Sequence, residues 1–120
     1  MLTKTVYGLT GSGEFLKDRG VRDQLQRAST SIMTNIAEGF DSGSNAEFLR
    51  FLSYARRSAS ELQSILYIAC DQDYITETQF KTTYLHAEKI RKMVTALSVY
   101  LRTHRKSGQP TRQPANSLTR

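Results

Sequence analysis

Apolar residues recur at helical spacing along most of the chain. In the first strong series, successive members are three or four positions apart and share one helix face: Val21, Leu25, Ala28, Ile32 and Ile36. The turn residues DSGS (41–44) follow Gly39 and predict the end of this helix. We expect a helix from about residue 20 to Gly39. That glycine either allows a close helix approach or caps the helix, and we favour the cap.

A second helix is predicted to begin at Ser44, because Ser44 with Glu47 fits a capping box. Its first apolar seam is Phe48, Leu52, Ala55, Ala59, Leu62, Leu66 and Ala69. A second seam runs beside it: Phe51, Tyr54, Ser58, Glu61, Ile65 and Ile68. A helix with two seams must be covered from two sides, so it lies between neighbours or lends one side to another copy. The predicted oligomer interface is Phe51, Tyr54, Ile65 and Ile68.

A third long helix is predicted after the interruption DQDY (71–74). Thr76 with Gln79 forms another capping box, and the apolar pattern continues to about His104, with Glu88 and Lys92 spaced for an ion pair. Towards the N-terminus only a short helix is expected, because glycines follow it closely. The predicted organisation is a short helix and loop over 1–20, a helical core over 21–104 and a disordered basic tail over 105–120. The fold class is all-α, with antiparallel neighbours.

The net charge of +6 belongs mostly to the tail. From Arg102 onward there are five basic residues and no acids, which leaves 12 basic against 11 acidic residues in positions 1–101. A basic tail can hold phosphate through counterion release, or it can simply keep a protein soluble. Further cations that could contact nucleic acid lie on the second and third helices and at the start of the tail. The candidate nucleic-acid-binding residues are Arg50, Arg57, Lys89, Arg91, Lys92, Arg102, Arg105 and Lys106.

The sequence offers little for catalysis, metal binding or membrane insertion. Cys70 is the single cysteine, and with two histidines it makes no metal-ligand cluster at a familiar spacing. No apolar run approaches the roughly 20 residues that span a bilayer, and no export signal opens the chain. We therefore expect a cytoplasmic protein that is not an enzyme and has no cofactor, metal or catalytic residue.

Polar residues nevertheless interrupt the core-facing stretch SIMTNIAEGF (31–40). Asn35 and Glu38 could act as an acid–base pair, but no nucleophile, phosphate loop or metal set accompanies them. The favoured alternative is a structural polar layer inside the bundle, formed by Asn35, Glu38, Arg56, Ser58 and Glu61. In that interpretation, replacing Glu38 with alanine lowers stability more than it affects binding.

The stretch SIMTNIAEGF followed by EFLRFLSYARRSASEL (47–62) resembles the signature of a bacterial four-helix-bundle family. That family includes the 23S rRNA intervening-sequence proteins and the accessory variability proteins of diversity-generating retroelements. The similarity is continuous from about Val6 to Leu101, and the combination of S-I-x-x-N-I-A-E-G with E-F-x-R-F-L is specific. The resemblance implies an antiparallel four-helix bundle and a ring-shaped homopentamer. The retroelement members look like accessory proteins that bind nucleic acid and a reverse transcriptase, so the resemblance implies such binding and no catalytic site.

One departure from the family concerns the first helix, which is full-length in most members and is reduced here to about Leu2–Thr10. Either the natural start lies upstream, or the first helix is short and leaves part of the groove between the other helices uncovered. The function we expect is a non-enzymatic, homopentameric scaffold that binds RNA or DNA, as an accessory to an RNA- or reverse-transcriptase-containing complex. The alternative is an adaptor for a protein partner, with no nucleic-acid role.

Overall fold

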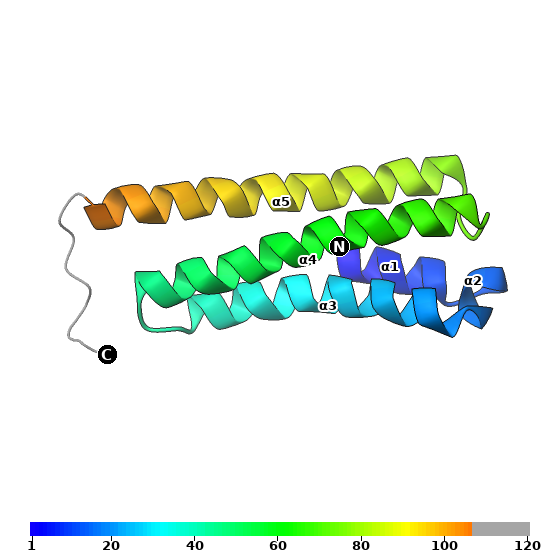
Figure 1. Ribbon diagram of the computed structural model, residues 1–120, viewed down its shortest axis with the longest axis horizontal. Helices are drawn as coiled ribbons and strands as arrows, with labels where there is room; N and C mark the ends of the chain where they lie inside the picture. The colour runs from blue at the N-terminus through cyan, green and yellow to red at the C-terminus, as the bar shows by residue number, and fades with distance from the viewer. Residues whose placement is uncertain (107–120) are drawn as a thin grey trace.

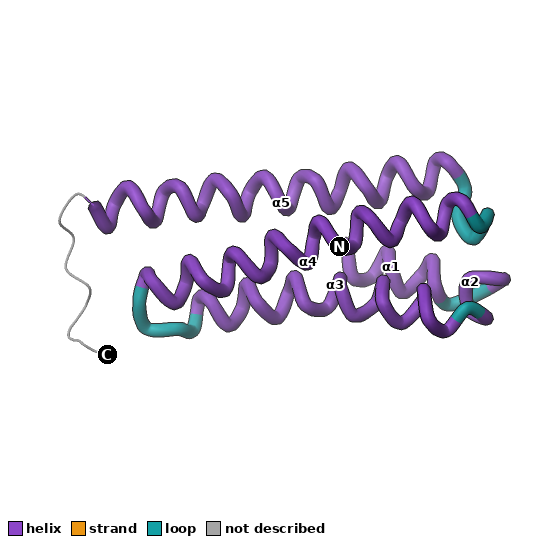
Figure 2. Tube along the Cα trace, in the orientation of Figure 1, coloured by secondary structure: helices purple, strands orange, loops and turns teal. Residues whose placement is uncertain are grey.

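The computed structural model describes the backbone of residues 1–106 and the side chains of residues 1–104. These residues form helices joined by short turns and contain no strand (Figure 2). The helices are α1 (Leu2–Thr10), α2 (Gly13–Lys17), α3 (Arg19–Phe40), α4 (Asn45–Asp71) and α5 (Glu77–Lys106). The all-α prediction is confirmed. Most of the predicted disordered tail, from residue 107 onward, lies outside the described residues.

Helix α4 lies between α3 and α5 and packs along both of them (Figure 1). The bundle is elongated, measuring 52 × 21 × 18 Å. The first apolar seam of α4 supplies much of the core, and six of its members are fully buried: Leu52, Ala55, Ala59, Leu62, Leu66 and Ala69. Burying aliphatic side chains stabilises a fold by about 1.5–3 kcal/mol for each leucine-sized group, so this seam is the main source of cohesion.

Helix α1 occupies the fourth corner of the bundle and packs against α3 and α5. At about 1.5 Å per residue, its nine residues rise about 13 Å, against about 33 Å for the 22 residues of α3. Its start therefore lies midway along the bundle, where Figure 1 marks the N-terminus. Within the described residues the first helix covers Leu2–Thr10, the range that the sequence indicated. Beyond that start, α3, α4 and α5 have no fourth helix from the described residues beside them.

The segment between α1 and α3 is more ordered than the sequence suggested. Its glycines predicted a loop, yet α2 forms there and places Phe15 in the core, with only 1% of its surface exposed. The Phe15 ring stacks on Tyr74, with ring centroids 5.2 Å apart. Asp18 accepts hydrogen bonds from the Tyr74 hydroxyl at 2.7 Å and from the Val21 backbone N–H at 3.1 Å. These contacts attach the N-terminal segment to the turn between α4 and α5.

The predicted capping boxes are found in part. The box before α5 is complete, because Gln79 N–H donates to Thr76 Oγ1 and Thr76 N–H donates to Gln79 Oε1. At α4 only half of the box forms: Ser44 Oγ accepts from the Glu47 N–H at 3.1 Å, while the Glu47 carboxylate pairs with Arg50 instead. The starts of both long helices were nevertheless correctly located.

The interpretation of Gly39 as a cap is wrong. Helix α3 continues through Phe40, and a Cβ atom built on Gly39 would lie 2.8 Å from the Phe48 ring and 3.3 Å from the Phe51 Cβ atom. Gly39 therefore allows α3 and α4 to approach closely just before the turn that joins them. This close approach was the alternative that the sequence left open.

No described helix combines the length and apolar character required to cross a membrane.

Replacing Gly39 with alanine should destabilise the protein by about 1–3 kcal/mol, because the added methyl group overpacks the contact with Phe48. Gly8 provides the matched control, since it also lies within a helix but a Cβ atom there meets nothing within 4 Å. Gly8→Ala should be neutral or stabilising by up to about 1 kcal/mol. Urea unfolding of the two variants measures the difference. Equal midpoints would contradict the close approach.

The Asp18–Tyr74 contact should make stability depend on acid pH. The hydrogen bond from Tyr74, with a smaller effect of the Val21 N–H, holds the pKa of Asp18 below its ordinary value of 3.8. A carboxyl group whose pKa is lowered by folding stabilises the protein above its unfolded pKa, and this contribution disappears as the pH falls through the folded pKa. Tyr74→Phe should therefore be less stable than the parent at neutral pH. The difference in urea midpoint should shrink as the pH falls below about 4; a constant difference would contradict the coupling.

Candidate nucleic-acid interface

Two of the predicted arginines meet aromatic side chains on the outer face of α4. Arg50 and Arg57 are seven residues apart, and Tyr54 lies between them. Each guanidinium carbon lies 5.7 Å from the centre of the Tyr54 ring, and that of Arg50 is also 5.1 Å from the Phe51 ring centre. These distances are within the range of cation–π attraction. We call Arg50, Phe51, Tyr54 and Arg57 the arginine–aromatic strip.

The two arginines of the strip differ in their charge environment. Arg50 donates to Glu47 Oε1 at 2.6 Å and to the Tyr54 hydroxyl at 3.3 Å, and these contacts raise the pKa of its guanidinium group. Arg57 has no acidic partner among the described side chains. Both arginines are exposed. An incoming anion would therefore meet an unneutralised charge at Arg57 and a partly neutralised one at Arg50.

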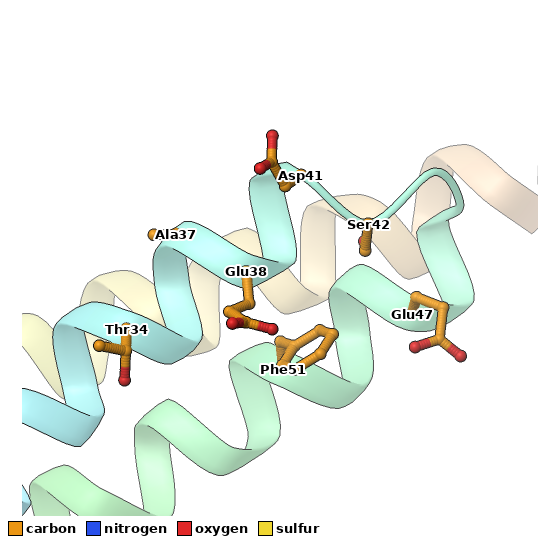
Figure 3. Close-up of a pocket in the computed structure, with 7 residues that line it drawn as sticks. All are labelled: Thr34, Ala37, Glu38, Asp41, Ser42, Glu47 and Phe51. Atoms are coloured by element: carbon orange, nitrogen blue, oxygen red, sulfur yellow. The ribbon is translucent and has the colours of Figure 1, made fainter.

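An acidic hollow of about 500 Å³ borders the strip between α3 and α4. Its lining comprises Thr34, Ala37, Glu38, Asp41, Ser42, Glu47 and Phe51. Figure 3 shows Glu38 reaching from α3 toward Phe51, while Asp41 and Glu47 point in other directions. Within the described residues, no three His, Cys, Asp or Glu side chains gather as metal ligands. The carboxylates of Glu38, Asp41 and Glu47 make this border of the strip less attractive to an anion than the side of Arg57.

Part of the predicted polar layer exists and joins α3 to α4. The hydroxyls of Ser31 and Ser58 lie 2.8 Å apart, and Asn35 Nδ2 donates to the Ser31 carbonyl at 2.8 Å and to its hydroxyl at 3.0 Å. Ser58 is buried and Asn35 is half-buried. Ser31 was not among the predicted residues, although its position four residues before Asn35 on the same face was a usable signal.

The other three members of that layer were wrongly predicted. Glu38, Arg56 and Glu61 are exposed, and none of them has a hydrogen bond or an ion pair with a described residue. The apolar side of α3 is centred on Ile32, and Glu38 lies well outside it, at the edge of the α3–α4 contact. Arg56 and Glu61 on α4 are likewise exposed. Glu38 has apolar and small neighbours in the sequence, but its side chain lies on the exposed side of α3.

The predicted oligomer interface is interrupted. Ile65 is only 4% exposed and belongs to the core of this chain, so it is unavailable to another copy and its assignment to an exposed seam is wrong. Phe51 and Tyr54 are half-buried in the strip. Ile68 is 46% exposed and remains a free apolar position on α4. The second seam therefore does not form one exposed surface. Ile65 is buried within the chain, whereas Ile68 is exposed to solvent.

The cations of α5 do not form one group. Arg91 pairs with Glu88, with Nη2 2.9 Å from Oε1, and Glu88 also accepts from Gln63 of α4 at 2.9 Å. The pKa of Glu88 is lowered mainly by the hydrogen bond from Gln63 and, to a smaller extent, by the hydrogen bond from Arg91. Arg91 therefore replaces Lys92 in the predicted ion pair and supports packing between α4 and α5. Exposed cations remain at Lys89, Lys92 and Arg102, and the side chains of Arg105 and Lys106 lie outside the described residues.

Replacing Ser58 with alanine should lower the free energy of unfolding by about 1 kcal/mol, because it removes a buried hydrogen bond between α3 and α4. Glu38→Ala should change it by less than about 0.5 kcal/mol, since Glu38 is exposed without a partner. Chemical denaturation of both variants beside the parent provides the comparison. A greater loss for Glu38→Ala than for Ser58→Ala would restore the polar layer as first predicted.

Two comparisons with known proteins find relatives. The family model described as 23S rRNA-intervening sequence protein matches residues 1–96. A solved structure from Bacteroides thetaiotaomicron VPI-5482, described as a protein with unknown function from the S23 ribosomal protein family, is 25% identical with a TM-score of 0.74. The alignment covers 81% of this chain and 87% of that one. No curated protein matches. Neither description names an enzymatic activity.

Proposed function

This chain belongs to the 23S rRNA-intervening sequence protein family, and from that premise we propose that it is a non-enzymatic, homo-oligomeric scaffold that binds nucleic acid through the arginine–aromatic strip of α4. The observation that carries the proposal is that the guanidinium groups of Arg50 and Arg57 both lie over the Tyr54 ring. Guanidinium groups bind phosphate through paired N–H donors, and aromatic rings and guanidinium planes stack on unpaired bases. A strip that combines both suits single-stranded nucleic acid.

Self-association supplies what a single subunit lacks. Positions 1–101 have nearly balanced charge, and one strip offers two arginines, of which one is already paired with Glu47. Affinity from counterion release grows with the number of phosphates contacted, so a single strip binds weakly. Several copies side by side would multiply the contacts on one strand. The exposed Ile68 on the same helix supports association beside the strip.

The competing function is a protein-interaction adaptor. Tyrosine and arginine are also the residues that dominate protein–protein contacts, and the Arg50–Glu47 pair and the acidic hollow weaken the attraction for phosphate. In this alternative, the strip contacts a polypeptide and the basic residues near the C-terminus only add solubility. The two functions differ in their dependence on salt and on nucleic acid.

The variant Arg50→Ala/Arg57→Ala should weaken binding to labelled single-stranded RNA and DNA across a series of salt concentrations. The slope of log K against log salt should become shallower by about 0.7 for each phosphate that the variant no longer neutralises. Lys4→Ala/Lys81→Ala removes the same charge from exposed positions on α1 and α5 and should have little effect. Arg57→Lys keeps the charge but removes the planar group, so an intermediate weakening would indicate stacking.

Two further chains make the outcome decisive. A chain ending at Lys106 keeps α5 intact and removes Arg112 and Arg120, and it should retain binding that depends on the strip. Ile68→Glu should lower the mass measured by sedimentation and weaken nucleic-acid binding with it. Absence of binding at low salt in both chain lengths would reject the nucleic-acid function. Binding by the full chain that is indifferent to the arginine substitutions would assign it to the tail instead.

A further inference from the structure

An apolar groove of about 460 Å³ lies beyond the start of α1. One wall is formed by Met33, Ile36 and Phe40 of α3, and the other by Ile90, Met93 and Leu97 of α5. Leu52 of α4 contributes to its lining and is fully buried. None of the residues of the arginine–aromatic strip lines this groove.

The groove continues the path of α1. Helix α1 packs against α3 and α5, and the same two helices supply both walls of the groove, while Met1 and Leu2 close one end. Along α5 the lining extends from His86 to Leu97, a span of about 16 Å at 1.5 Å per residue. The space therefore has the position and the length of about three turns of a helix in line with α1.

Large apolar side chains at this groove are exposed to solvent. Phe40 and Met93 are exposed by 70% and 61%, more than most other apolar side chains of the described residues. An apolar groove rimmed by such side chains is a characteristic docking site for the apolar face of a helix. Three methionines line it (Met1, Met33 and Met93), and their flexible side chains adapt to different apolar anchors.

We propose that this groove binds an amphipathic α-helix of about three turns from a partner protein, in the fourth position of the bundle. The partner helix presents apolar residues at helical spacing to the groove, and acidic residues on the flank that faces α5. This interaction is independent of nucleic-acid binding by the strip and adds a protein partner to the proposed scaffold.

The acidic flank follows from the charges beside the groove. Met93 lines both the groove and a shallow hollow on α5 that also contains Lys89, Lys92 and Glu88, whose carboxylate is paired with Arg91. Both lysines are exposed, and neither forms an ion pair with a described residue. On the opposite wall, α3 presents Ala37 rather than a charged side chain next to Ile36 and Phe40. A helix seated in the groove therefore meets positive charge along one edge.

The experiment uses the full chain and synthetic 12-residue peptides whose helical form is fixed by a side-chain staple. The acidic peptide has leucine at positions 1, 4, 8 and 11 and glutamate on one flank; its twin has lysine in place of glutamate. A third peptide has the acidic composition with the leucines scattered around the helix. Isothermal titration should show binding of the acidic peptide at about micromolar affinity, weaker binding of the lysine twin and none of the scattered peptide.

Protein variants locate the binding. Met93→Glu should weaken the acidic peptide by about tenfold or more, because it places a like charge at the groove. Val99→Glu is the matched control, since Val99 is exposed on the same helix by 53% but lies outside the groove lining. It should leave the affinity within about twofold. Lys89→Glu/Lys92→Glu should reverse the preference towards the lysine twin.

Other occupants give distinct results that overturn the proposal. If Met93→Glu dissociates an assembly of the peptide-free protein, as measured by sedimentation, and the peptide does not bind the parent, a second copy occupies the groove. If the acidic peptide raises the melting temperature only when it is joined to Met1, the groove suits an extension of this chain and not a separate partner. Peptide binding that Met93→Glu leaves unchanged places the site elsewhere.

Discussion

The contact between α3 and α4 is the constraint on which the rest of the structure depends. It joins two long helices through small residues: Gly39 lies against Phe48 and Phe51, and Ser31 meets Ser58 through their hydroxyls. The helices approach closely at Gly39, and Ile65 of α4 is buried in the core of this chain. The same approach leaves Glu38 at the outer edge of the contact. The placement of the acidic hollow and of the strip beside it therefore follows from one packing arrangement.

Helix α4 connects this contact to everything else in the molecule. One side is covered by α3 and another by α5, where Gln63 donates to Glu88 and the Tyr84 carbonyl. Only the remaining outer face is free for polar side chains, and that face holds Arg50, Tyr54 and Arg57. Arg50 and Arg57 are exposed there, so a ligand that approaches this part of α4 from solvent meets their guanidinium groups.

The sequence was sufficient for features that depend on local chemistry. Caps at Ser44 and Thr76 involve residues three apart, and the seam of α4 follows from helical periodicity, so both were correctly placed. Features that depend on distant partners were not predictable in the same way. Phe15 is buried by Tyr74, which is remote in sequence, and the glycine-rich context around Phe15 indicated a loop. Gly39 was misassigned because a cap and a close approach require the same residue, and only the position of Phe48 separates them.

The candidate site shows the same division. The spacing of seven residues puts Arg50 and Arg57 on one line of α4, but it could not show that both guanidinium groups lie over the Tyr54 ring or that Glu47 pairs with Arg50. The assignment of Ile65 to an exposed seam failed because helical periodicity gives the direction of a side chain on α4. It does not show how much of the α4 surface the neighbouring helices cover. The α5 cations were divided for a similar reason, since Gln63 on α4 draws Glu88 and Arg91 together.

The attachment of the N-terminal segment has a consequence for how the molecule opens. Asp18 and Tyr74 are 56 positions apart, so their contact closes a long loop, and it can form only after α3, α4 and the turn into α5 are in place. α1 and α2 are short, and their release exposes far less core than the separation of the long helices. We therefore expect α1 and α2 to detach before the three long helices separate. Such a detachment would remove Met1 and Leu2 from one end of the apolar groove between α3 and α5, so the groove would become longer.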